Sequence, residues 1–209
     1  QTALMRRYDV ISEICDCMLS LGWKPYQNDH EDANGQFEMN WDFDDCLLTA
    51  DRHVFFKYMV KSIAERHGVR ATFMPKPIFG ENGSGMHVHQ SLFLKDKNAF
   101  YDASDEFNLS TIARQYIAGL MRHAPEITAV CNQWVNSYKR LVPGYEAPVY
   151  VSWARRNRSA MIRVPMYKPG KENATRIEFR SPDPACNPYL AFAVMLGAGL
   201  KGIENKYEL

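Results

Sequence analysis

Residues 74–93, MPKPIFGENGSGMHVHQSLF, limit the possible fold of this chain more than any other segment. The first half cannot form a regular helix or strand, because its prolines lack a backbone donor and its glycines free the backbone for tight turns. In the second half, His87, His89 and Ser91 fall on one side of an extended chain, since side chains alternate in a strand. We therefore predict a glycine-rich loop that leads into a strand with two imidazoles and a hydroxyl on one face.

The residues alone leave two interpretations of this loop and strand open. Backbone N–H groups of a glycine-rich loop suit an oxyanion, and neutral imidazoles suit a metal ion. The alternative is a plain turn before a strand whose histidines are half buried, because a glycine-rich loop by itself is a weak signal.

Residues 30–41, HEDANGQFEMNW, hold the second informative pattern. Asn34-Gly35 is the strongest short signal for a two-residue hairpin loop, and that register places Glu31 directly opposite Glu38. Like charges in a cross-strand pair are destabilising unless a cation lies between them, and hard divalent cations prefer carboxylate oxygens. We interpret the pair as metal ligands, with a solvated coincidence as the alternative.

Two arginine-bearing segments follow in the second half of the chain. Residues 136–148, NSYKRLVPGYEAP, form a proline- and glycine-shaped loop with Arg140 and Glu146, and charged loops of this kind often carry function. Arg158 and Arg163 belong to a cluster of four arginines over residues 155–163. Guanidinium groups fork onto phosphate oxygens, so the cluster predicts a phosphate clamp; a charged rim is the alternative.

Residues 175–180, TRIEFR, alternate as a strand that places Arg176, Glu178 and Arg180 on one face. Two arginines around a glutamate could form a self-neutralising surface strand. If the strand faces a cleft, the same residues would supply a metal ligand between two anion-binding groups.

Periodicity and capping signals predict an α+β fold in one domain, since no linker divides the chain. The formal net charge of +1 gives no indication of a nucleic-acid or membrane partner, and the longest apolar run is too short to span a bilayer. The five cysteines form no C-x-x-C pair and are typical of reduced thiols, which predicts a cytoplasmic protein. Because the chain starts without Met and is helical almost at once, we expect residues to be missing at both ends. The predicted helices run from residue 4 to the glycine at 22, and over 47–67, 109–121 and 189–205; further strands are predicted at 69–73 and 149–153, and a polar hairpin or loop at 95–101.

Taken together, a carboxylate hairpin, a glycine-rich loop with His87, an arginine-rich segment and an Arg-Glu-Arg strand supply what phosphoryl transfer needs. These are divalent metal ions and positive charge around a polyphosphate. The residues therefore predict an enzyme that depends on ATP and metal ions, without naming its substrate.

Three long segments then carry a resemblance: FGENGSGMHVHQSL, NSYKRLVPGYEAPVYVSWARRNRSAMIRVP and TRIEFRSPDPACNPYLAFA. They resemble the signature segments of the bacterial-type glutamine synthetase family, in the same order and over nearly the whole chain. The wording HEDANGQFEMNW is similar to the type III subgroup, which is close to the γ-glutamylmethylamide synthetases. The resemblance implies that residues 1–209 are the catalytic domain, with an antiparallel sheet that forms part of an active-site barrel, helices packed outside, and the N-terminal β-domain and C-terminal segment absent.

The resemblance also implies a role for individual residues. It assigns ligands of two or more Mg²⁺ or Mn²⁺ ions, contacts to glutamate, contacts to ATP, and groups that act in the chemistry. The metal ligands are Glu31, Glu38, His87 and Glu178; the glutamate contacts are Asn82, Gly83, Arg140 and Arg180; the nucleotide contacts are Phe43, His89, Ser91 and Arg176; and the catalytic groups are Glu146, Arg158 and Arg163.

The family chemistry implied is phosphorylation of the glutamate γ-carboxylate by ATP, followed by attack of ammonia on the acyl phosphate to give glutamine. Methylamine as the acceptor is a serious alternative, and a non-catalytic family member is a third. The resemblance further implies a role in nitrogen metabolism and a homo-oligomer, expected to be a dodecamer with active sites between subunits. A third glutamate ligand for each metal site is expected upstream of Gln1, so we expect these residues alone to be inactive.

Overall fold

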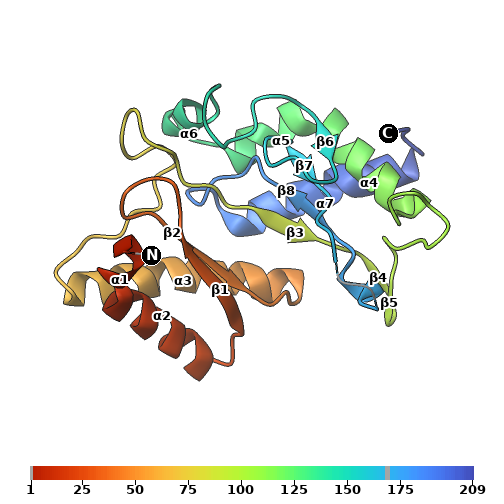
Figure 1. Ribbon diagram of the computed structural model, residues 1–209. Coiled ribbons are helices and arrows are strands. Elements are labelled where there is room, and N and C mark those ends of the chain that lie inside the picture. Colours follow the sequence, from red (N-terminus) through yellow and green to blue (C-terminus); the bar gives the residue numbers. More distant parts are fainter. Residues whose placement is uncertain (1, 168–169) are drawn as a thin grey trace. The chain divides into compact units, whose positions relative to one another are not determined.

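The computed structural model describes residues 2–167 and 170–209, and these fold into two compact units. Unit 1 comprises Gln1–Gly83 and unit 2 comprises Ser84–Leu209. Figure 1 shows helices and short sheets in both, as the predicted α+β class requires. None of the helices in the described ranges is long and apolar enough to cross a membrane.

Unit 1 packs two helices and a hairpin around a small apolar core. Its elements are α1 (Thr2–Met5), α2 (Tyr8–Ser20), β1 (Pro25–His30), β2 (Phe37–Trp41) and α3 (Cys46–Arg66). Met18 of α2 and Ile63 of α3 are almost fully buried in this core, together with Phe56 and Trp23. Asp45 caps α3 through hydrogen bonds from the backbone N–H groups of residues 47 and 48, which confirms the predicted helix there.

The buried face of α3 differs from the one that periodicity predicts, which comprises Leu47, Val54, Phe55, Tyr58, Met59 and Ile63. Phe56 and Met59 point into the core, whereas Phe55 and Tyr58 remain 44% and 69% exposed. His53, expected on the surface, is only 8% exposed. Both faces of α3 carry large apolar residues, so periodicity alone could not decide which face is buried.

The hairpin register is shifted by two residues from the predicted one. Glu38 pairs with Asp29 and Phe37 with His30, so Glu31 is not directly opposite Glu38. A two-residue type I′ loop needs positive φ at both central residues, and here Gly35 alone has it (φ 72°). The chain instead turns through a longer loop closed by a hydrogen bond from Gln36 N to Ala33 O. Because the shift is even, Glu31 and Glu38 still lie on the same face.

Unit 2 contains a four-stranded sheet in the order β3-β8-β7-β6. Its strands are β3 (Val88–Gln90), β8 (Ile177–Phe179), β7 (Ile162–Arg163) and β6 (Trp153–Ala154). The pairs β3–β8 and β8–β7 are antiparallel, as expected, whereas β7–β6 is parallel. The strands are shorter than predicted: residues 149–152 lie outside β6, and the strand expected at 69–73 of unit 1 is irregular chain.

Unit 2 also contains helices, some of which pack against this sheet. They are α4 (Thr111–Arg122), α5 (Ala124–Cys131), α6 (Val135–Arg140) and α7 (Pro188–Glu204), with a short 3₁₀ turn, η1 (Glu172–Ala174). Ser110 and Asn187 cap α4 and α7 as the sequence predicts, and the expected polar hairpin is formed by β4 (Phe93–Leu94) and β5 (Lys97–Asn98). Side chains of α4 and α7 share one apolar cluster with the inner residues of β7 and β8.

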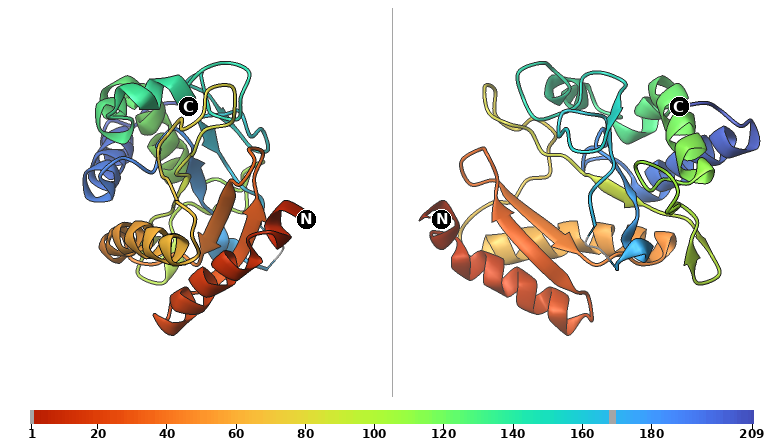
Figure 2. Two further views of the ribbon diagram at one scale, coloured as in Figure 1. Left: turned by 90° about the vertical axis from the view of Figure 1, so that its left-hand side faces the viewer. Right: turned by 45° about the vertical axis from the view of Figure 1, so that its right-hand side comes forward.

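The two long helices of unit 2 approach each other at glycine residues (Figure 2). A Cβ on Gly202 of α7 would lie 2.1 Å from Gln115 O, and a Cβ on Gly119 of α4 would lie 2.2 Å from Ala198 O. A Cβ on Gly199 would lie 2.1 Å from the Tyr116 ring. Backbone therefore meets backbone at this crossing, which only glycine permits.

Candidate functional site

A buried charged cluster surrounds Glu178 on the central strand β8 of unit 2. The Glu178 side chain is 2% exposed and accepts hydrogen bonds from Arg163 Nε and, at 2.7 Å, from Arg180 Nη1. The register of β7 against β8 places Arg163 beside Glu178, and the strand period places Arg180 on the same face. The cluster is buried, so the alternative of a self-neutralising surface strand is wrong.

His87 completes this cluster from the chain just before β3. Its Nδ1 lies 3.3 Å from Glu178 Oε1 and 3.4 Å from Arg180 Nη1. Burial, followed by the positive charges of Arg180 and Arg140, lowers the pKa of His87 well below its ordinary value. The imidazole is therefore neutral at neutral pH, the form that can coordinate a cation.

Arg140 reaches the same region from the end of α6, and residues 136–140 are helical instead of the predicted loop. Its side chain donates to the carbonyl oxygens of Ser181 at 2.7 Å and Arg180 at 3.1 Å. Burial lowers the pKa of Arg140 to about 10, so the group stays charged at neutral pH. A Cβ on Gly85 would lie 2.7 Å from Arg140 Nη2 and 2.9 Å from His87 Nε2, so the glycine makes room for both side chains.

Sequence reasoning missed a buried polar network that fixes the chain after β8. Asn132 Nδ2 donates to Ser181 O at 2.8 Å and to Asp183 Oδ2 at 3.1 Å, and Ser181 Oγ donates to Asn132 Oδ1. Asn132 and Asp183 are both fully buried. The signal available in the sequence was Asp183 between two prolines, a polar residue held in a rigid segment. This network positions the backbone that carries Arg180.

The two residues expected to contact a nucleotide on β3 and β8 lie side by side. Arg176 Nε donates to His89 Nδ1 at 3.0 Å. Since the guanidinium can only donate, His89 Nδ1 is unprotonated there, and its neutral tautomer carries the proton on Nε2. Ser91 follows one residue after the end of β3.

The structure does not bring every predicted residue of unit 2 into the cluster. Glu146 and Arg158 lie exposed in loops, outside the helices and strands of the unit. The predicted clamp of four arginines is therefore divided: Arg163 is in the buried cluster, whereas Arg155 lies over the ring of Phe107 at 5.6 Å.

The carboxylates of unit 1 interact although their register differs from the prediction. A hydrogen bond with Glu38 and then burial raise the pKa of Glu31 to about 7. The pKa is raised because two carboxyl groups held close together cannot both ionise at low cost. Phe43, expected near a nucleotide, is 77% exposed in the segment before α3.

Two pairs of side chains in the structure have donor atoms that fit divalent cations. The paired carboxylates of unit 1 and the imidazole–carboxylate pair of unit 2 are oxygen and nitrogen donors that such cations accept. Within the described ranges, no three His, Cys, Asp or Glu side chains converge in one place.

Asn82 and Gly83, at the end of unit 1, are tied to the hairpin loop. Asn82 Nδ2 donates to Asp32 Oδ2 at 2.9 Å, and Gln36 Nε2 donates to Gly83 O at 2.9 Å. No pattern in the sequence indicates these partners, since both contacts depend on how the hairpin turns.

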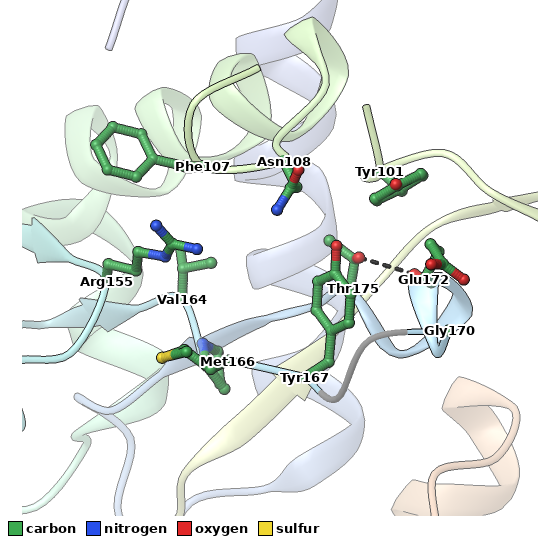
Figure 3. A pocket seen from close by; sticks show the side chains of 11 residues that line it. Tyr101, Phe107, Asn108, Arg155, Val164, Met166, Tyr167, Gly170, Glu172 and Thr175 are labelled. Carbon is green, nitrogen blue, oxygen red and sulfur yellow. Dashed lines mark hydrogen bonds between the residues drawn. The ribbon is translucent and has the colours of Figure 1, made fainter. Parts of the chain in front are cut away.

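Unit 2 also has a cavity of about 270 Å³ beside η1 (Figure 3). Its wall includes Tyr101, Asn108, Arg155, Tyr167 and Glu172, and Thr175 Oγ1 donates to Glu172 O at 2.7 Å. Arg155 is the one member of the arginine cluster in this wall, and the wall includes none of the predicted metal ligands or glutamate contacts, so we do not place the chemistry there.

Comparison with known sequences identifies relatives over almost the whole chain. A family model described as "Glutamine synthetase, catalytic domain" matches residues 2–209. The chain is 56% identical to a glutamine synthetase of Rhizobium meliloti, covering 100% of this chain and 48% of that protein. It is 56% identical to a glutamine synthetase of Methanosarcina mazei, covering 98% of this chain and 45% of that protein. The chain thus spans about half the length of the curated relatives it matches.

Solved structures share this fold. An ADP complex of GmaS superimposes with a TM-score of 0.92 at 53% identity, covering 100% of this chain and 48% of that one. The glutamine synthetase of Plasmodium falciparum, determined by cryo-electron microscopy, superimposes with a TM-score of 0.91 at 35% identity, covering 95% of this chain and 38% of that one.

Proposed function

The chain belongs to the glutamine synthetase catalytic-domain family, and we propose that this protein is an ATP-dependent ligase that converts glutamate and ammonia to glutamine. The reaction would activate the γ-carboxylate as γ-glutamyl phosphate and release ADP and phosphate. The observation that carries the proposal is the buried cluster in which Arg163 and Arg180 hold Glu178 beside a neutral His87. Burying this much charge costs stability, and such groups are retained where chemistry needs them.

Arg140, Arg180, Asn82 and Gly83 are the proposed contacts to glutamate. Arg180 spends Nη1 on Glu178 and His87, and its buried Nε has no hydrogen-bond partner within the described chain. An unpaired guanidinium donor is suited to an anionic oxygen, because Arg forks onto carboxylates. This free donor supports the assignment of Arg180 to a substrate carboxylate.

ATP would contact His89, Ser91, Arg176 and Phe43. The hydrogen bond from Arg176 to His89 holds the imidazole in the tautomer protonated at Nε2 and places the two proposed nucleotide contacts side by side. Arg176 Nη1 donates to Ala174 O, and the other terminal nitrogen of the guanidinium, Nη2, would donate to an anion of the nucleotide.

Divalent ions, Mg²⁺ or Mn²⁺, would be held by Glu31 with Glu38 and by His87 with Glu178. When bound, they supply positive charge that offsets the charge of the transferred phosphoryl group. The donor types fit, because carboxylate oxygens and a neutral imidazole nitrogen are ligands that such cations accept.

Arg163 and Arg158 are the proposed contacts to the transferred phosphoryl group. Arg163 is already held by Glu178, whereas Arg158 lies in an exposed loop and would approach when substrate binds. Glu146, in the loop after α6, is the proposed base that takes a proton from the incoming ammonium, and the same loop would exclude water from the acyl phosphate.

Methylamine is the second candidate for the acceptor, which would give γ-glutamylmethylamide. The wording HEDANGQFEMNW and the structural likeness to GmaS favour it. The two acceptors differ by one methyl group, and a pocket discriminates such a group by only about 1–3 kcal/mol. A non-catalytic role is the least supported. Such a protein would have lost the residues needed for chemistry, and this chain retains Glu31, Glu38, His87, Glu146, Glu178 and Arg180.

We further propose that residues 1–209 form one catalytic domain that acts in nitrogen metabolism in the cytoplasm. The relatives support assembly into a homo-oligomer, and a dodecamer with active sites between subunits is the form we propose. Nothing in the charge of the chain favours a nucleic-acid or membrane partner.

The test is phosphate release by the full-length protein with Mg-ATP and glutamate, comparing ammonium with methylamine over a concentration series. A much higher kcat/KM with ammonium supports glutamine synthesis, and the reverse supports methylamine use. The matched variants are Arg163→Gln, expected to lower kcat at least about a hundredfold, and Arg156→Gln, an exposed neighbour expected to have no effect. Phosphate release with neither amine, in a protein shown to be folded, would refute the ligase function.

A further inference from the structure

The orientation of the Asn82 side-chain amide is fixed by its partner. Asn82 Nδ2 lies 2.9 Å from Asp32 Oδ2. An ionised carboxylate can only accept a hydrogen bond, so the NH₂ side of the amide must face Asp32. The oxygen, Oδ1, therefore faces away from the hairpin loop, and this conclusion does not depend on how the amide is assigned.

The amide oxygen of Asn82 receives no hydrogen bond from the part of the chain that the structure describes. Asn82 Oδ1 is shielded from solvent and has no hydrogen-bond partner within the described chain. A buried acceptor without a donor is unfavourable, and native proteins keep few of them. A donor that arrives with a ligand would relieve this cost.

The hairpin loop holds the neighbouring residue in the same way. Gln36 Oε1 accepts from Ala33 N at 3.2 Å, which turns Gln36 Nε2 toward Gly83 O at 2.9 Å. Two side chains of one loop thus hold two consecutive residues of the glycine-rich segment. Gly80, at φ 84°, lies just before them, in a backbone conformation that favours glycine.

We propose that Asp32 is a positioning residue that keeps the Asn82 amide oxygen directed at the bound amino acid, where it accepts a hydrogen bond from the substrate α-ammonium group. The assignment rests on the proposed function, because it takes glutamate as the substrate. At neutral pH the α-ammonium is the only donor of glutamate, since both of its carboxylates accept. Asp32 acts through Asn82 and does not itself touch the substrate.

A positioning role predicts a selective loss. In the full-length protein, Asp32→Ala frees the amide to rotate and is expected to raise KM for glutamate about tenfold, with KM for ATP unchanged. Glutarate, which is glutamate without the amino group, serves as a competitive inhibitor. Its inhibition constant is expected to stay within about twofold of the wild-type value, because glutarate lacks the group that Asn82 binds.

Asp29→Asn is the charge control. The charges of Asp29 and Asp32 both act on Glu31, but only Asp32 contacts Asn82. The control should therefore reproduce any change in metal dependence that comes from charge alone, without changing the ratio of glutamate KM to glutarate inhibition constant.

Exchange of the two residues tests orientation directly. In the double variant D32N/N82D, Asn at 32 donates to the carboxylate at 82, and the second carboxylate oxygen takes the place of Oδ1. Each single substitution should raise KM for glutamate, and the double variant should recover most of the loss.

Three results would overturn the assignment. They are an unchanged glutamate KM in Asp32→Ala, an equal rise in the glutarate inhibition constant, or a double variant no better than either single one. Thermal unfolding of each variant separates these results from loss of the fold. If the wild-type protein releases no phosphate with glutamate, the proposed function fails first, and the substrate named here fails with it.

Discussion

The crossing of α4 and α7 offers the most quantitative test of the structure, through two glycines of one helix. Gly202 faces α4, where an added Cβ would lie 2.1 Å from Gln115 O and 2.8 Å from Gly119 Cα. Gly197, five residues earlier, is exposed and has nothing within 4 Å of an added Cβ. Ala at either position gains helix propensity, but only Ala at 202 must displace backbone.

The expected magnitudes follow from these contacts. Replacing Gly by Ala in a helix interior gains about 1 kcal/mol, which is the whole effect at Gly197. At Gly202 the helices must separate by about 1 Å to restore ordinary contact, and overpacking of this kind costs about 3 kcal/mol. The net result is a stabilisation of about 1 kcal/mol for Gly197→Ala and a loss of about 2 kcal/mol for Gly202→Ala.

Thermal unfolding of the two variants checks the reasoning. For a domain of this size 1 kcal/mol corresponds to about 2–4 °C, so Tm should rise by about that amount in Gly197→Ala and fall by about 4–8 °C in Gly202→Ala. Equal shifts in the two variants, or a higher Tm in Gly202→Ala, would refute the close approach of the helices. A loss of activity in Gly202→Ala is also expected, because Tyr116 of α4 donates to Gln90 of β3, which lies between the proposed nucleotide contacts His89 and Ser91.

Three further outcomes are expected from the charges of the molecule. Glu178→Gln removes the carboxylate that compensates the guanidinium groups of two arginines. It should lower the free energy of unfolding, measured by urea denaturation, by about 3–5 kcal/mol. The control Glu204→Gln, at an exposed position at the end of α7, should change this free energy by less than about 0.5 kcal/mol. The pKa of Glu31 is raised to about 7, so metal binding below that pH must displace a proton. The affinity for Mn²⁺ should therefore fall up to about tenfold per pH unit from about pH 7 down to about pH 5. Calorimetry in buffers of different ionisation enthalpy should show the release of the proton. His67 Nε2 donates a hydrogen bond to the Glu13 carboxylate, which raises the pKa of His67 above its ordinary 6.5. The contribution of this pair to stability is therefore complete below pH 6.5 and is lost as pH rises through the raised pKa. His67→Asn should flatten this part of a stability–pH curve, and an unchanged curve would contradict the assignment.

The comparison of sequence with structure is instructive in the hairpin of unit 1. The Asn34-Gly35 pair predicted the turn, but the register is offset by two residues, because Asn34 does not take the left-handed conformation that a two-residue loop requires. Glu31 and Glu38 still lie on one face of the hairpin, because a shift of two residues preserves the face of each side chain. The local sequence therefore determined on which face of the hairpin each carboxylate lies, and the turn geometry determined which residue of the other strand lies opposite it.

The helices show a similar division. Capping signals located the starts of α4 and α7, because a side chain that accepts from the first turn acts over a few residues. The predicted buried face of α3 was wrong, because apolar residues surround that helix. Only packing in the core of unit 1 selects Phe56 over Phe55. No pattern in the sequence indicated that Gly119 and Gly202 lie where α4 and α7 cross.

The sequence by itself determined the chemistry of this protein: the residue types, their alternation along β3 and β8, and the family to which they belong. Those features are local, because the strand period and the motif order are written along the chain. Only the tertiary structure decided which charges are buried and which groups orient them. The pairing of Arg163 with Glu178, the network of Asn132 and Asp183, and the hold of Asp32 on Asn82 each join segments far apart in the chain. No local pattern encodes such contacts, since they depend on how the strands and loops pack.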